Sequence, residues 1–107
     1  MTTLETLKAA RKLIELPEHW TRGTFARDVK GNSIPWDQVS TCPIEGSFCA
    51  LGALWRARGS DYTREDEAAL RAVLQEKFRG IDNFNDTHAH AEVLAAFDEA
   101  IARLEAL

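Results

Sequence analysis

Hydrophobic residues recur at helical spacing towards both ends of the chain. Near the N-terminus an apolar face alternates with a charged one, which predicts a helix over residues 3–16. This helix should end at Pro17, because proline lacks the amide hydrogen that a continuing helix needs. The same spacing predicts a helix over residues 63–79 and a last helix from Asp86 or Thr87 to the C-terminus.

The middle of the chain holds a segment that is apolar on almost every side. It covers residues 47–58, where Ser47 is a candidate N-cap and Gly59 a candidate stop. A helix without a polar face has to be enclosed by the rest of the protein. We therefore expect this helix at the centre of the fold.

Helical spacing is lost over residues 18–46, which are interrupted by glycines, prolines and a polar run. Residues 24–29 and 33–34 are candidate strands of a small hairpin, since Gly31 and Asn32 tolerate the backbone angles of a tight turn. The predicted fold class is mainly α: a compact bundle of about four helices around the central apolar helix, with an irregular segment that contains this candidate β-hairpin.

Composition narrows the class of protein. The 107 residues, 45% hydrophobic and 28% charged, fit a single domain over residues 1–107 that builds its core without a cofactor. A net charge of −4 disfavours a nucleic-acid partner. The longest apolar run, residues 48–55, is far shorter than the roughly 20 residues that span a bilayer. No signal peptide precedes the first helix, so we expect a cytoplasmic protein with Cys42 and Cys49 as reduced thiols.

Cys49 has two interpretations. Close behind a helix N-cap, its thiol would be activated by free amides and the helix dipole, a placement that resembles papain-like hydrolases. Its partners would then be His88 or His90, oriented by an acid or amide side chain from the set Asn85, Asp86 and Asp98. Alternatively, Cys49 is a small packing residue beside Gly52, where another backbone comes close; we favour this second interpretation.

The histidines do not form a recognisable metal site. Two positions apart on a helix, His88 and His90 point about 200° away from each other, and a zinc site with Cys42 and Cys49 has the wrong cysteine spacing. We expect no metal. His90 should lie at the edge of the core with a hydrogen-bond partner, and His88 should be solvated.

Two acidic segments are expected to have structural roles. Residues 82–86 should form a turn that caps the last helix, with Phe84 inserted into the core. Residues 61–67 should be the solvated start of a helix, in which Thr63 and Asp66 form a near capping box.

The remaining aromatic and polar residues suggest a groove between the irregular segment and the starts of two helices. We expect a non-enzymatic binding module for a protein or small-molecule partner, with a purely structural domain as the rival interpretation. The C-terminal helix carries a wide apolar stripe around Phe97, Ile101 and Leu104, so a homodimer through it is a further prediction. The candidate binding residues are Trp20, Trp36, Cys49, Asn85, Asp86 and His90.

Several segments together resemble a family of small bacterial and phage proteins of unknown function. They are the Leu-Pro-Glu-His-Trp segment that follows the first helix, the Cys-Ala-Leu-Gly-Ala segment that begins at Cys49, and the Phe-Asn-Asp segment that ends at Asp86. The resemblance covers most of the chain. It implies no particular activity.

Overall fold

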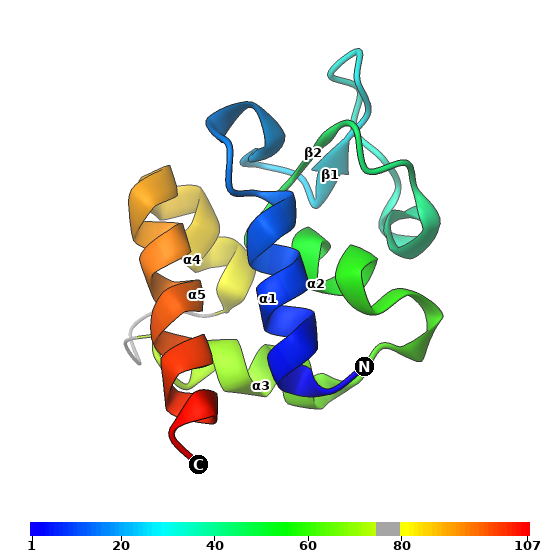
Figure 1. Ribbon diagram of the computed structural model, residues 1–107. Coiled ribbons are helices and arrows are strands. Elements are labelled where there is room, and N and C mark those ends of the chain that lie inside the picture. Colours follow the sequence, from blue (N-terminus) through cyan, green and yellow to red (C-terminus); the bar gives the residue numbers. More distant parts are fainter. Residues whose placement is uncertain (75–79) are drawn as a thin grey trace.

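The computed structural model describes residues 1–74 and 80–107, and helices dominate it (Figure 1). Short 3-10 helices and a two-stranded sheet join the α-helices. The α-helices are α1 (Thr3–Leu13), α2 (Ala50–Arg58), α3 (Arg64–Arg71), α4 (Ile81–Thr87) and α5 (His90–Glu105). The 3-10 helices are η1 (Pro17–His19), η2 (Trp36–Thr41) and η3 (Gly59–Asp61), and the strands are β1 (Ala26–Arg27) and β2 (Ser47–Phe48). The predicted mainly α class is confirmed.

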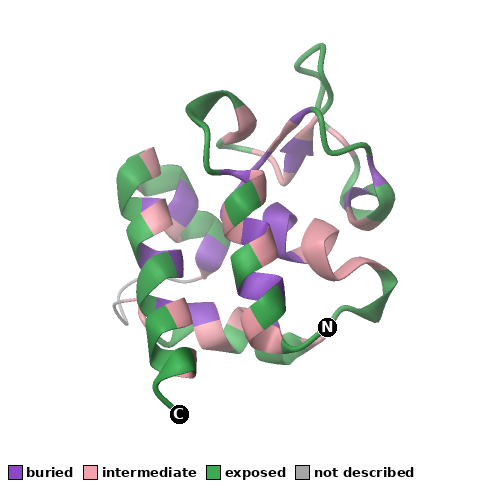
Figure 2. Ribbon diagram, in the orientation of Figure 1, coloured by how far each residue is buried: buried purple, intermediate pink, exposed green. Residues whose placement is uncertain are grey.

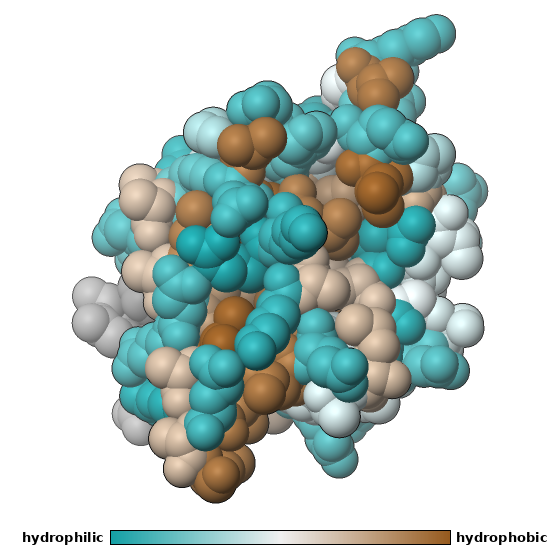
Figure 3. Space-filling model, viewed as in Figure 1, coloured by the Kyte–Doolittle hydropathy of each residue, from teal (hydrophilic) through white to brown (hydrophobic). Residues whose placement is uncertain are grey.

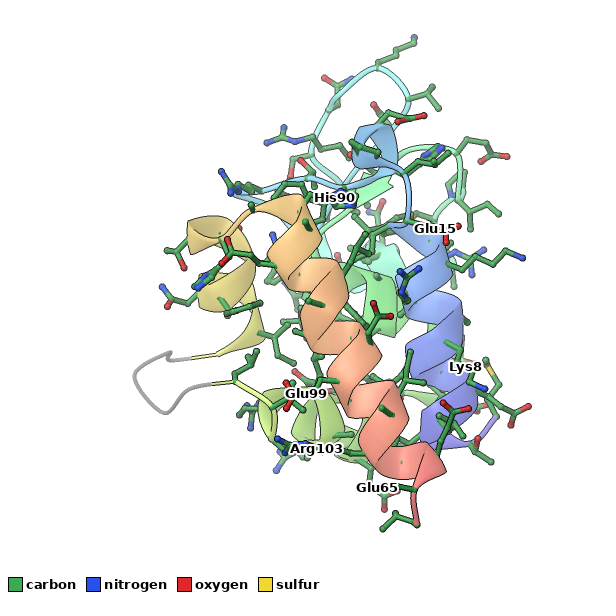
Figure 4. The ribbon with its side chains drawn as sticks, turned by 60° about the vertical axis from the view of Figure 1, so that its left-hand side comes forward. Lys8, Glu15, Glu65, His90, Glu99 and Arg103 are labelled. Atoms are coloured by element: carbon green, nitrogen blue, oxygen red, sulfur yellow. The ribbon has the colours of Figure 1, made fainter. Side chains whose placement is uncertain are left out.

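Helices α1 and α5 pack side by side (Figures 1 and 4), and ion pairs join them. Arg11 donates to Asp98 over 2.6 Å, and Lys8 lies 3.1 Å from Glu105. Helix α1 begins with a capping box between Thr2 and Glu5. It ends at Leu13, before the predicted residue 16, because the proline that follows Leu16 holds that residue in extended geometry.

Helix α2 forms the centre of the core, as predicted (Figure 2). Residues 50–54 are all buried, and the helix contacts α1, α3, α4 and η2. It begins at Ala50 rather than Ser47, because Ser47 and Phe48 form strand β2. Cys49, not Ser47, is therefore the N-cap residue.

Strand β1 pairs antiparallel with β2, with Ala26 opposite Phe48. The turn of the predicted hairpin is present, since Gly31 has φ +87° and its N–H donates to the Asp28 carbonyl over 2.9 Å. The two predicted arms meet at the bridge between Arg27 and Ser33, where the Ile34 N–H donates to the Ala26 carbonyl over 2.9 Å. The ladder partner of β1 comes instead from the segment that enters α2, a pairing that local turn chemistry does not reveal.

The acidic segments differ from the predictions. The predicted helix over residues 63–79 is α3, which ends at Arg71; the last part of that prediction lies outside the described residues. Thr63 precedes α3, but its hydroxyl makes no hydrogen bond to the described residues, so the predicted capping box is absent. Residues 82–86 are not a turn but most of helix α4.

Helix α5 begins at His90, later than predicted, because the Glu92 side chain accepts a hydrogen bond from the Ala89 N–H and fixes the helix start there. Its apolar stripe enters the monomer's own core through Val93, Phe97 and Ala100. Hydrophobic surface is visible in the seam between α1 and α5 and at the C-terminal end (Figure 3). Leu107 is 99% exposed, and a homodimer through this helix stays a prediction.

Among the described residues, none of the helices combines the length and the apolar character needed to cross a membrane.

Candidate functional site

Asn85 is a fully buried hydrogen-bonding hub. Its Oδ1 accepts from the Trp20 indole N–H over 2.7 Å and from the Ala50 N–H over 3.0 Å. Its Nδ2 donates to the Thr21 carbonyl over 2.9 Å and to Asp86 Oδ1 over 3.2 Å. Each polar atom of the amide is thus used within the protein, and Asn85 joins α4 to the start of α2 and to the irregular segment.

The ring of Trp20 is covered as well as hydrogen-bonded. The Arg22 guanidinium lies 5.0 Å from its ring centroid, and the His90 ring packs 5.3 Å away. A cation over an indole face is a favourable electrostatic contact. Trp20 therefore serves to hold the irregular segment on the helices.

His90 lies at the start of α5, close to the end of α1 (Figure 4). Its Nε2 is 2.6 Å from the Ile14 carbonyl oxygen and its ring is half-buried, so the prediction of a core-edge histidine with a hydrogen-bond partner is confirmed.

The prediction of a solvated His88 is wrong. His88 belongs to the connection between α4 and α5, stacks on Phe84 at 4.1 Å and places Nδ1 3.0 Å from the Phe84 carbonyl oxygen. The reason is that α5 begins two residues later, so His88 never joins its polar face.

Cys49 is 1% exposed and caps α2 with its sulfur, which accepts a hydrogen bond from the Gly52 N–H over 3.3 Å. Burial raises the pKa of the Cys49 thiol to about 11, against the smaller lowering effect of the Gly52 and Leu51 amides. A thiol with such a pKa is almost entirely protonated at neutral pH and is a poor nucleophile. Neither His90 nor His88 is a hydrogen-bond partner of the sulfur in the described structure.

Gly52 lies against another backbone, as its predicted packing role requires. A Cβ at this position would stand 1.9 Å from the Phe25 carbonyl oxygen. The Cys49 N–H donates to that same oxygen over 3.1 Å. The start of α2 and the loop before β1 are thus in direct backbone contact, which only glycine permits.

Both cysteines, Cys42 and Cys49, are buried and free. In the part of the chain that the structure describes, no three histidine, cysteine or acidic side chains gather where they could hold a metal ion.

Arg58 and Asp66 form a buried ion pair that no sequence pattern predicted. Asp66 is fully buried, and Arg58 donates to both of its carboxylate oxygens, over 2.9 and 3.0 Å. The expectation of a solvated acidic helix start is therefore wrong at Asp66. This carboxylate turns inward to Arg58 instead of reaching back to Thr63, which also explains the missing capping box.

The groove expected from the sequence corresponds to a cleft of about 310 Å³, which we call the acidic cleft. Three predicted binding residues line it, namely Trp36, Cys49 and Asp86, whereas Trp20, Asn85 and His90 do not. Its polar groups are largely paired: Asp86 accepts from the Gly23 N–H over 3.0 Å, and the Thr24 and Ser33 hydroxyls lie 2.6 Å apart. The lining residues are Gly23, Thr24, Phe25, Ser33, Ile34, Trp36, Cys49, Asp82 and Asp86.

Trp36 also lines a second cleft, of about 360 Å³, which we call the aromatic cleft. Two more of its lining residues, Trp55 and Tyr62, are aromatic and were not among the predicted binding residues. The Trp55 and Tyr62 centroids are 6.4 Å apart and their ring planes meet at 88°. The lining residues are Trp36, Asp37, Ser40, Trp55, Gly59, Ser60 and Tyr62.

Three separate elements build the aromatic cleft. Trp36 begins η2, which is anchored by the fully buried Val39, and Trp55 projects from α2. Gly59 ends α2 at φ +68°, a conformation that other residues rarely adopt, and so turns the chain into η3 and Tyr62. Because η2 and Tyr62 are distant in sequence, local patterns could not reveal this cleft.

Comparison with known protein families matches residues 1–103 to a model described as a family of unknown function (DUF6197). Searches of curated proteins and of solved structures found no match.

Proposed function

The chain belongs to the family of unknown function DUF6197, and from that premise we propose that it is a non-enzymatic binding module whose ligand occupies the aromatic cleft. The proposal includes a cytoplasmic location and an association with bacteria and their phages, which rest on the sequence alone. The observation that carries the binding role is the exposure of Trp36, 69% of whose surface is open to solvent beside a concave apolar site.

The distribution of internal bonds favours the aromatic cleft over the other candidate sites. Trp20, Asn85 and His90 are engaged in hydrogen bonds that hold the fold together. Trp36 and Tyr62, in contrast, keep much of their ring surface in water, at 69% and 41% exposure. When a ligand covers exposed aromatic rings in a cleft, apolar surface leaves water and binding free energy is gained. Polar groups that already have hydrogen-bond partners within the protein contribute less. The adjoining acidic cleft offers room for an extension of the ligand.

The three indole N–H groups provide a test of this site. Proton–nitrogen correlation NMR would follow them during titration with a panel of small molecules and peptides. We expect ligands that shift the Trp36 and Trp55 signals and leave Trp20 unchanged, because the Trp20 N–H is held by Asn85 away from the cleft. A panel that shifts none of the indoles would favour the purely structural domain.

The cysteine hydrolase alternative predicts a different chemistry. A catalytic Cys49 would react with iodoacetamide in the native protein well below pH 8, since the thiolate is the reactive form. We expect no alkylation until the protein is unfolded in urea, because burial keeps the Cys49 thiol protonated. Intact-mass spectrometry measures the extent of reaction. Rapid modification of Cys49 in the native protein would support the hydrolase.

A further inference from the structure

The aromatic cleft has the geometry of a partial cage. Trp55 and Tyr62 form two walls at right angles, and Trp36 contributes a third ring from a different element. Trp55 also packs on Phe25, with ring centroids 4.7 Å apart, so a second ring of the protein supports this wall. Such an arrangement places several rings around one space, and an aromatic ring attracts a cation through the negative potential of its face.

The charge of the cleft has a single sign. Asp37 is the charged residue among those that line it, and within the described residues its carboxylate makes no hydrogen bond or ion pair. Two arginines of α2 have partners within the protein: Arg56 donates to the Cys42 carbonyl, and Arg58 donates to the Asp66 carboxylate. A cation that enters the cleft would therefore meet the Asp37 carboxylate, and the described residues that line the cleft include no basic side chain.

The polarity of the lining indicates which kind of cation fits. A primary ammonium carries three N–H donors that need replacement acceptors when they leave water. Apart from Asp37, the side chains here offer only the hydroxyls of Ser40, Ser60 and Tyr62. A quaternary ammonium has no N–H group, so it leaves water without losing hydrogen bonds, and its methyl groups pack on aromatic rings.

We propose that the aromatic cleft binds a small quaternary ammonium compound, held by the rings of Trp36, Trp55 and Tyr62 with Asp37 as the countercharge. The inference rests on the proposed function and names the ligand class of that same site. The cleft volume of about 360 Å³ suits a small molecule with a trimethylammonium head and a short tail.

Choline and its uncharged carbon isostere, dimethylbutanol, form the probe pair, because they have the same shape and differ in charge. Calorimetric titration should show binding of choline and at least about tenfold weaker binding of the isostere. Equal affinities would overturn the cationic ligand class while leaving a binding module in place. No binding of either probe would overturn this inference, and the indole panel would still decide the proposed function by itself.

Substitutions then locate the bound choline. Trp36→Leu and Tyr62→Leu change exposed rings, and each should weaken choline binding by about tenfold while circular dichroism stays unchanged. Asp37→Asn should weaken choline binding but not binding of the isostere, whereas Glu45→Asn, an acidic control outside the cleft, should change neither. If Trp36→Leu still binds choline with the original affinity, the choline site lies outside the aromatic cleft, and the proposal is wrong. If a trimethyl-lysine peptide binds the protein and choline does not, the ligand is a peptide and not a small molecule.

Discussion

At the scale of single residues, Cys49 shows how burial overrides a local effect. Amides at a helix start lower the pKa of a thiol, and the Gly52 and Leu51 amides act in that direction here. Desolvation is the larger influence, because the side chain is enclosed between α2 and the loop before β1. The net result is a hydrogen-bonding cap rather than a nucleophile.

The raised pKa of Cys49 makes stability depend on pH. The unfolded thiol loses its proton near its ordinary pKa of 9.0, whereas the folded thiol keeps it up to about 11. Its contribution is therefore complete below about pH 9 and is lost as the pH rises towards 11. A two-unit difference corresponds to about 2–3 kcal/mol in the free energy of unfolding.

Cys49→Ser tests this dependence, because serine keeps an N-cap acceptor and does not titrate in this range. We expect the unfolding free energies of the unsubstituted protein and of Cys49→Ser, both measured by urea unfolding, to approach each other as the pH rises from about 8 to 11. A difference that stays constant would show that the Cys49 thiol is not buried as described. The other titrating groups cancel in this comparison.

Gly52→Ala should destabilise the protein despite the better helix propensity of alanine. Propensity alone would favour alanine by about 1 kcal/mol. The new Cβ would meet the Phe25 carbonyl oxygen at 1.9 Å, and this neighbour is backbone that cannot rotate away. We expect a net loss of about 1–3 kcal/mol in urea unfolding. A stabilised variant would contradict the close approach.

The residue-scale predictions from sequence succeeded where the cause is local and failed where it is not. Gly52 in a helix signals a close approach, and His90 on an apolar face signals a hydrogen-bond partner, so both were predictable. The burial of Asp66 depends on Arg58 from another helix. An acidic residue at a helix start is usually solvated, so nothing local distinguishes this one.

At the scale of elements, α4 is the clearest failure of local reasoning. Asparagine and aspartate compete for backbone hydrogen bonds, so residues 82–86 have the composition of a turn. The segment is helical because the Asn85 side-chain amide bonds to Trp20, Ala50 and Thr21 and does not compete for the backbone of its own segment. Tertiary hydrogen bonds thus override a weak local preference. The pairing of β1 with β2 was missed for a related reason, since its partners lie on distant segments.

Asn85→Ala should cost about 3 kcal/mol in unfolding free energy. The substitution leaves the buried Ala50 N–H and the half-buried Trp20 N–H without their acceptor, and the half-buried Thr21 carbonyl without its donor. An unsatisfied group that is fully buried costs about 1–3 kcal/mol before relaxation, and a half-buried one costs less. The matched control is Asn83→Ala on the exposed face of the same helix, which should change stability by less than about 0.5 kcal/mol. Equal effects of the two substitutions would refute the hub, and chemical denaturation measures both.

At the scale of the whole molecule, the helical bundle around α2 was predictable because hydrophobic spacing reports directly on burial. The two clefts were not, since they form where segments distant in sequence meet. Trp36 belonged to the candidate binding set, but Trp55 and Tyr62 join it only once η3 folds back beyond Gly59. The sequence thus indicated a binding surface near Trp36 without its ring partners.

Helix α2 should also be the last element to open. It contacts α1, α3, α4 and η2, so its amides become exposed only when most of the fold is lost. We expect the slowest hydrogen exchange within residues 50–57, measured by NMR. Ala50 is the sharpest case: the first amides of a helix have no partner within it, yet this one donates to the buried Asn85 Oδ1. Its exchange should be slow in the native protein and fast in Asn85→Ala, and rapid exchange of Ala50 in the native protein would contradict both the hub and the central position of α2.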